Sequence, residues 1–140
     1  MSDLTRTIVI VVNFNGEKVL SRCLESLKHQ TFSNFKTIVV DNFSQDGSID
    51  SIDELFPSVE IIRLKENIGF AAANNYAIKK AKDFKWVALL NPDAIADPNW
   101  LLNLHAAADK NPVYDFFGSH LRKQGSLGQL DGTGDVYHLC

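Results

Sequence analysis

The stretch WVALLNPD, residues 86–93, decides the fold, because five apolar residues are followed directly by Asn91, Pro92 and Asp93. An unbroken apolar run of this length is typical of a strand that is buried on both faces of a parallel sheet. Such sheets bind ligands outside the carboxyl ends of their strands, which is where Asp93 follows the run. The stretch therefore predicts an α/β sheet with a carboxylate at its binding edge.

Two earlier apolar runs also end in polar residues. Residues 37–40 are followed by Asp41, and residues 8–12 are followed by the sequence NFNG at residues 13–16. Because the carboxyl ends of parallel strands meet at one edge of a sheet, we expect these polar groups and Asp93 to share one face. We interpret this face as a nucleotide-binding site in which Asp93 binds a divalent cation that neutralises a diphosphate.

Strands alternate with amphipathic helices from residue 7 to about residue 118, which predicts a mostly parallel sheet with right-handed crossovers. The expected strands are residues 7–13, 36–41, 59–64 and 86–90, and the expected helices begin near residues 17, 49, 70 and 97. Residues 113–118 are a further candidate strand. The chain after residue 118 is rich in glycine, which predicts loops or a hairpin and a last strand at residues 135–139.

Length and composition exclude several classes of protein. A chain of 140 residues suits a single domain over residues 1–140, with its regular core at residues 7–118. The 14 basic and 17 acidic residues form no basic stripe, so nucleic acid is not an expected partner. No apolar stretch approaches the ~20 residues of a transmembrane helix, and no signal peptide is apparent. The two cysteines form no disulfide or zinc pattern, so the expected location is the cytoplasm.

The tripeptide at residues 91–93 has two explanations. Pro92 disfavours a helical conformation at Asn91 and predicts an extended segment, with the side chains of Asn91 and Asp93 on one side. Both could then bind one Mg²⁺ or Mn²⁺ ion, with phosphate oxygens and water completing its shell. The alternative is a plain turn after the strand, which the tripeptide alone favours because all three residue types are common in turns.

The other polar residues at this edge also have two explanations each. Asp41 either braces the loop after it or accepts hydrogen bonds from a base or a ribose. Asn13 and Asn15 either shape a strand-to-helix turn or contact a nucleobase. Asn67 and Gly69 precede a helix whose N–H groups suit a phosphate or sugar, although Gly69 also suits a strained backbone. Geometry favours a ligand at Asp41, because carboxylates at neighbouring strand ends repel each other unless a cation or ligand lies between them.

Several rival sites are not supported. The chain has no Gly-x-x-x-x-Gly-Lys phosphate loop, and its only Gly-x-Gly, at residues 132–134, has Tyr137 where a dinucleotide fingerprint needs glycine. There is no Gly-x-Ser-x-Gly nucleophile motif. A zinc site is disfavoured too, because the acid, histidine and cysteine side chains near the chain end match no standard spacing.

Five motifs in order resemble family 2 glycosyltransferases, in particular the rhamnosyltransferase-like branch, over about residues 7–102. They are VVNFNG at residues 11–16, SL and QTF at residues 26–32, VVDN with the following S, D and G at residues 39–47, ENIGFA at residues 66–71 and LNPDA at residues 90–94. Each motif is weak alone, and the ordered set is specific. The resemblance implies a Rossmann-like GT-A fold that is incomplete at its C-terminal end, with residues 119–140 beginning the acceptor side.

The resemblance implies inverting transfer of a sugar, with rhamnose expected, from a dTDP- or UDP-sugar to a glycan or lipid-linked acceptor in cell-surface polysaccharide synthesis. Asp93 matches the metal-binding aspartate, with Mg²⁺ or Mn²⁺ as cofactor. The first acid of the family's Asp-x-Asp motif is Asn91 here, which predicts weaker metal affinity without diphosphate. The full set of expected nucleotide-sugar contacts is Asn13, Asn15, Asp41, Asn67, Gly69 and Asn91.

The catalytic base is not assigned, because family members place this acid beyond the position of Cys140. We therefore expect the chain to bind donor but to transfer sugar poorly or not at all. The full-length protein is expected in the cytoplasm, including the inner face of the membrane. One alternative is a non-catalytic nucleotide-binding module of the same fold. A nucleotidyltransferase is less favoured, because residues 13–18 lack the glycine- and lysine-rich loop that a triphosphate needs.

Overall fold

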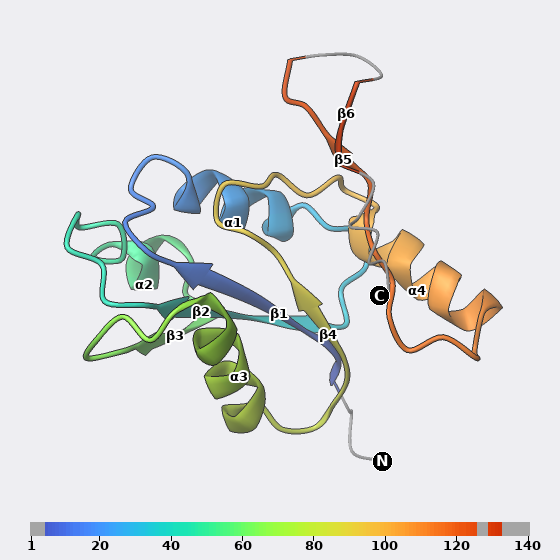
Figure 1. The fold of residues 1–140 in the computed structure, drawn as a ribbon, viewed down its shortest axis with the longest axis horizontal. Helices are drawn as coiled ribbons and strands as arrows, with labels where there is room; N and C mark the ends of the chain where they lie inside the picture. The colour runs from blue at the N-terminus through green and yellow to red at the C-terminus, as the bar shows by residue number, and fades with distance from the viewer. Residues whose placement is uncertain (1–4, 126–128, 133–140) are drawn as a thin grey trace, which may run out of the picture. The chain divides into compact units, whose positions relative to one another are not determined.

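The computed structural model describes residues 5–125 and 129–132, and the chain divides into two compact units, Met1–Asn99 and Trp100–Cys140. Strands and helices alternate through the first unit, as the sequence predicts (Figure 1). Its elements are β1 (Thr5–Asn13), α1 (Leu20–Lys28), β2 (Phe35–Asp41), α2 (Ile52–Leu55), β3 (Val59–Arg63), α3 (Phe70–Lys80) and β4 (Phe84–Leu89).

The four strands of the first unit form one parallel sheet in the order β3-β2-β1-β4. The chain builds outward from β1 to β3 and then returns to the other side of β1 for β4. The strand order therefore reverses between β1 and β4, and α/β sheets bind ligands at such a switch point. In register, Asn13 lies opposite Asp41 and Ile10 lies opposite Leu89. The loops after β1, β2 and β4 consequently leave the sheet at the same edge.

Helices cover both faces of this sheet, which explains why its central strands are continuous apolar runs. On one face, alternate residues of β1 and β2 pack against Ala73 and Ala77 of α3; they are Ile8, Ile10, Val12, Ile38 and Val40. The helices α1 and α2 lie on the other face (Figure 1). Since successive side chains of a strand point to opposite faces, Asn13 and Asp41 point to the α1 and α2 side.

The second unit contains α4 (Trp100–Lys110) and an antiparallel hairpin of β5 (Leu121–Arg122) and β6 (Leu130–Gly132). The hairpin expected from the glycine-rich sequence is thus confirmed. The strand expected at residues 113–118 is wrong: these residues form no strand, and the side chains of Val113 and Phe116 are 82% and 93% exposed. An apolar run becomes a strand only where a neighbouring strand offers backbone partners, and none of the described strands pairs with it.

Two expectations from the sequence are not tested by the structure. The last strand, at residues 135–139, lies outside the described residues, and the single domain stays a prediction. No helix in the described part of the chain combines the length and apolar character that crossing a bilayer requires.

Candidate functional site

Asn13, the last residue of β1, is fully buried and links β1 to the loop after β2. Its Nδ2 donates hydrogen bonds to Asp41 Oδ1 at 3.1 Å, to Ser44 Oγ at 3.1 Å and to Ser48 Oγ at 2.8 Å. The amide nitrogen is the end that must face Asp41, because a carboxylate only accepts hydrogen bonds. The Asn13 Oδ1 atom is also buried and has no hydrogen-bond partner within the described residues. Asn13 therefore fixes the position of Asp41 across the first two strands.

Asp41, the last residue of β2, is only 4% exposed. Its Oδ1 accepts the bond from Asn13, and its Oδ2 accepts a bond from the Ser44 backbone N–H at 3.3 Å. The bracing role considered from the sequence is thus confirmed. A carboxylate offers about four acceptor positions, so these two bonds leave capacity for a ligand N–H or hydroxyl. The nucleotide contact at Asp41 stays a prediction.

Asn15 ties the loop after β1 to the loop after β2. Its backbone N–H donates to Ser44 Oγ at 2.9 Å, and its Oδ1 accepts from the Gln45 backbone N–H at 2.9 Å. Asp46 adds a further tie, since its Oδ2 accepts from the Glu17 backbone N–H at 2.8 Å. The side chain of Asn15 thus shapes these loops, and its contact with a nucleobase stays a prediction.

The sequence did not predict a role for Asn42, which joins the loops after β2 and β3. Asn42 is 3% exposed; its Nδ2 donates to Asn67 Oδ1 at 2.9 Å, and its Oδ1 accepts from the Ile68 backbone N–H at 2.9 Å. Asn67 Oδ1 also accepts from the Gly69 backbone N–H at 2.9 Å. The one feature of the sequence that could have indicated this role is the position of Asn42 directly after Asp41, at the end of a strand.

Gly69, at the start of α3, has a φ of 83°. This left-handed conformation is readily adopted by glycine and costs other residues free energy. The backbone role considered for Gly69 is thus confirmed. Contacts of Asn67 and Gly69 with a phosphate or sugar stay predictions.

Residues 91–94 form a β-turn, so the plain turn considered from the sequence is confirmed and the extended conformation is wrong. The Ala94 backbone N–H donates to the Asn91 carbonyl oxygen at 3.0 Å, which places Pro92 and Asp93 at the centre of the turn. Pro92 disfavours a helical conformation at Asn91, but the φ of proline itself suits the second position of a turn. The preference of Pro92 for the turn decides the conformation here. The side chains of Asn91 and Asp93 are both exposed.

Asp93 lies close to α1. The buried Cys23 of α1 hydrogen-bonds through its sulfur to the Asn91 carbonyl oxygen at 3.5 Å. Burial and, second, the negative charge of Asp93 raise the pKa of the Cys23 thiol to about 12. The turn therefore lies on the α1 side of the sheet, the side to which Asn13 and Asp41 also point. Only β1 separates β2, which ends in Asp41, from β4, which precedes the turn.

The turn fits a metal ion that arrives with a ligand. Within residues 5–125 and 129–132, no three His, Cys, Asp or Glu side chains cluster closely enough to hold a metal ion. Mg²⁺ usually takes one or two protein carboxylates, and phosphates and water supply its other oxygens. An exposed Asp93 beside an exposed Asn91 amide matches such a shared shell. The turn does not fit a cation held by the protein alone.

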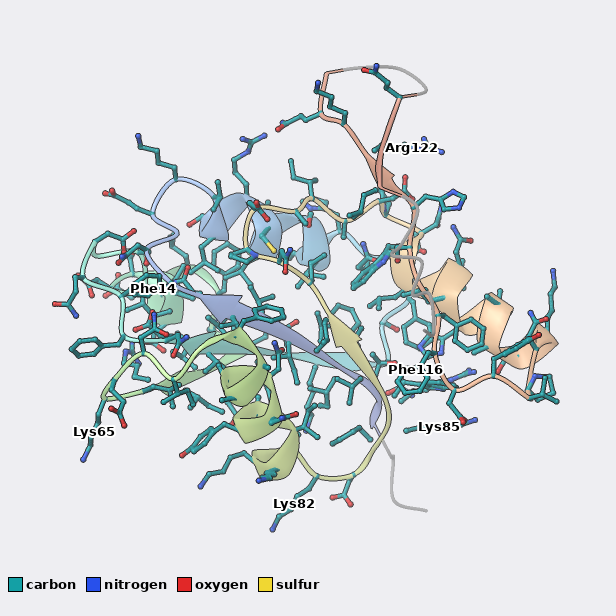
Figure 2. The ribbon with its side chains drawn as sticks, in the orientation of Figure 1. Phe14, Lys65, Lys82, Lys85, Phe116 and Arg122 are labelled. Carbon is teal, nitrogen blue, oxygen red and sulfur yellow. The ribbon has the colours of Figure 1, made fainter. Side chains whose placement is uncertain are left out.

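Exposed apolar side chains surround the same edge. Phe14, Phe43, Ile68 and Phe70 are 50%, 44%, 37% and 52% exposed, and they follow the ends of β1, β2 and β3. Figure 2 shows Phe14 beyond the end of β1. Binding sites for planar ligands commonly combine apolar faces with a few fixed polar groups. This edge offers both, with Asp41 as the buried polar group.

The model of glycosyl transferase family 2 matches residues 8–133 of the chain. The chain belongs to glycosyltransferase family 2. It is 28% identical over 137 residues to an uncharacterized glycosyltransferase of Haemophilus influenzae, a match that covers 92% of this chain and 42% of that protein. It is 27% identical over 141 residues to the N-acetylglucosaminyl-diphospho-decaprenol L-rhamnosyltransferase of Mycobacterium tuberculosis, covering 92% of this chain and 43% of that protein. The family 2 chain thus spans less than half the length of these relatives.

Solved structures confirm the GT-A fold. S. aureus TarS in complex with UDP-GlcNAc matches with a TM-score of 0.70 and 26% identity, over 76% of this chain and 32% of that chain. A mannosyltransferase of Pyrobaculum calidifontis, in complex with GDP-Man and Mn²⁺, matches with a TM-score of 0.66 and 24% identity, over 74% of this chain and 32% of that chain. The second likeness supports the fold alone.

Proposed function

We propose that this chain binds the donor in a transferase that moves a sugar from a nucleotide diphosphate to a glycan or lipid-linked acceptor in cell-surface polysaccharide synthesis. One observation carries the proposal: the bonded pair of Asn13 and Asp41 and the turn with Asp93 point to one side of the sheet, around its switch point. The similarity to the M. tuberculosis L-rhamnosyltransferase supports this class of reaction. The catalytic base stays unassigned.

The nucleoside, in this proposal, lies against the loops after β1 and β2. Asp41 accepts a hydrogen bond from a base N–H or a ribose hydroxyl, and Asn13 and Asn15 border the same site. The exposed rings of Phe14 and Phe43 offer faces on which a base can stack. The UDP-GlcNAc complex of TarS supports a nucleotide-sugar ligand for this fold.

The diphosphate, in this proposal, lies near Asp93 and Asn91, and the sugar lies near Asn67 and Gly69. Asp93 and Asn91 would hold a Mg²⁺ or Mn²⁺ ion there, and the positive charge of such an ion would neutralise the charge of the diphosphate. A UDP- or dTDP-sugar is the proposed donor, and rhamnose is the proposed sugar on the strength of the M. tuberculosis relative.

Calorimetric titration of UDP, dTDP and GDP, with and without MnCl₂, tests the proposal. We expect UDP or dTDP to bind more tightly with Mn²⁺, and Asp93→Ala to remove about tenfold or more of that gain. Glu25→Ala, which removes an exposed acid from α1, is the matched control and should keep the gain. Nucleotide binding that ignores both Mn²⁺ and Asp93→Ala would contradict the transferase site and favour a plain nucleotide-binding module.

A further inference from the structure

One face of α1, and the residues just after it, are hydrogen-bonded to the loop that carries Asp93. The Ser26 Oγ atom accepts from the Ala96 backbone N–H at 3.0 Å. The Gln30 Nε2 atom donates to the Asp97 carbonyl oxygen at 2.6 Å. One bond comes from the helix and the other from the residues just after it, and both go to backbone atoms of the loop, so they fix the path of the chain rather than the rotamer of one side chain.

Two further residues, Cys23 and Thr31, extend this row at its ends. Cys23 bonds to the Asn91 carbonyl oxygen at 3.5 Å, and the Thr31 backbone N–H donates to the Pro98 carbonyl oxygen at 2.9 Å. The Thr31 hydroxyl also donates to Asn99 Oδ1 at 2.9 Å. Cys23 and Ser26 are three residues apart in α1 and so lie on the same side of the helix, while Gln30 and Thr31 follow the end of the helix. We name the four residues the α1 anchor: Cys23, Ser26, Gln30 and Thr31.

Residues 92–95, which include Asp93, lie between the first and the later contacts of the α1 anchor. They lie outside the sheet, because β4 ends at Leu89. Figure 1 shows the chain after β4 running along α1. A ligand group must be held within about 0.5 Å of its working position to bind a metal well, and a loop achieves this only through such supporting bonds.

We propose that the α1 anchor positions Asp93 for the cation that accompanies the diphosphate, an inference that rests on the proposed function above. Ser26 is central because its hydroxyl donates to the Cys23 carbonyl oxygen at 2.6 Å while it accepts from Ala96. Removing that oxygen leaves the Ala96 N–H, which belongs to a buried residue, without its partner. Mutating a residue that supports a metal ligand in this way typically lowers metal affinity by about 10- to 100-fold.

The test compares UDP affinity with and without MnCl₂ in Ser26→Ala, Gln30→Ala and the conservative variant Ser26→Thr. Ser21→Ala, the same change at an exposed position of α1, is the matched control. We expect Ser26→Ala and Gln30→Ala each to lower the Mn²⁺-dependent gain in affinity about tenfold and to leave metal-free affinity unchanged. Ser26→Thr keeps the hydroxyl and should keep the gain, as should Ser21→Ala.

Anchor variants that keep the full gain would overturn the inference. So would an equal loss of affinity with and without Mn²⁺, because that result marks general support of the fold. Gln30→Ala is interpreted independently of Ser26→Ala. It shortens a half-buried side chain that follows the helix, so its Mn²⁺-dependent affinity can be measured even if Ser26→Ala does not fold. If Mn²⁺ does not increase the UDP affinity of the wild-type chain, the proposed function itself is overturned. The α1 anchor would then have no cation for which to position Asp93.

Discussion

Replacing Gly16 by alanine should destabilise the chain by about 1 to 2 kcal/mol, because the new Cβ would collide with Asn13. The added Cβ would lie 2.3 Å from Asn13 Oδ1, and real Cβ atoms are not found closer than 3.0 Å to such neighbours. Gly16 is not among the glycines with positive φ, so its backbone conformation accepts alanine. The predicted cost therefore comes from the contact alone.

The size of the effect follows from how firmly Asn13 is held. Its Nδ2 shares its two hydrogens among three acceptors at 2.8 to 3.1 Å, so its Oδ1 cannot move away without stretching these hydrogen bonds. Losing one or two such bonds costs about 1 to 3 kcal/mol. The lower entropy of the unfolded chain with alanine offsets about 0.4 to 1 kcal/mol of this.

Urea denaturation measures the free energy of unfolding in a double-mutant cycle with Asn13→Ala. In the Asn13→Ala background the collision is absent, so Gly16→Ala should cost nothing or stabilise the chain slightly. Gly118→Ala is the matched control, because nothing lies within 4 Å of its added Cβ; it should change stability by less than about 0.5 kcal/mol. A neutral Gly16→Ala, or the same cost in both backgrounds, would refute the reasoning.

Three further predictions concern backbone strain and ionisation. Phe43 has a φ of 70°, so Phe43→Gly should raise the free energy of unfolding in urea by about 1 kcal/mol, while calorimetry shows weaker UDP binding. Burial and Asp93 raise the pKa of Cys23 from 9.0 to about 12, so in a Cys140→Ser background this thiol should resist iodoacetamide at pH 9. The stability contributed by that shift is complete below pH 9 and is lost as pH rises toward 12. A hydrogen bond from the Ser48 side chain lowers the pKa of Asp46 below 3.8. The stability that the ionised Asp46 contributes is present above pH 3.8 and is lost as the pH falls further. Asp46→Asn should therefore make the stability of the chain less dependent on pH in acid, as measured by circular dichroism.

The sheet could be predicted from the sequence because its central strands are buried on both faces. Residues 8–12 and 38–40 are continuous apolar runs, and each is followed by the polar residue that the structure places at the carboxyl end of its strand, Asn13 or Asp41. The family resemblance pointed to the same edge. The hydrogen bond between Asn13 and Asp41 depends on the register of β1 against β2, which the structure supplies and the sequence analysis did not predict.

The sequence predicted three other features less well: the turn at residues 91–93, the segment at residues 113–118 and the role of Asn42. At residues 91–93, the restriction that proline places on its predecessor competes with the preference of proline for a turn. The residue types alone favour the turn, which the structure shows, and the expectation of an extended segment gave too much weight to the restriction on Asn91. At residues 113–118, the apolar pattern does not reveal whether a strand is available to pair. Asn42 escaped notice because an asparagine at a strand end resembles an ordinary turn former, and its partners lie 25 and 26 residues further along the chain.

A crystal structure with UDP and Mn²⁺ bound is the most direct test of the shared nucleotide and metal site, since anomalous scattering locates the manganese. We expect the manganese in contact with an Asp93 carboxylate oxygen and with the diphosphate, and the uridine within hydrogen-bond distance of Asp41. Manganese bound away from Asp93, or UDP bound with its uridine away from Asp41, would contradict the proposed site.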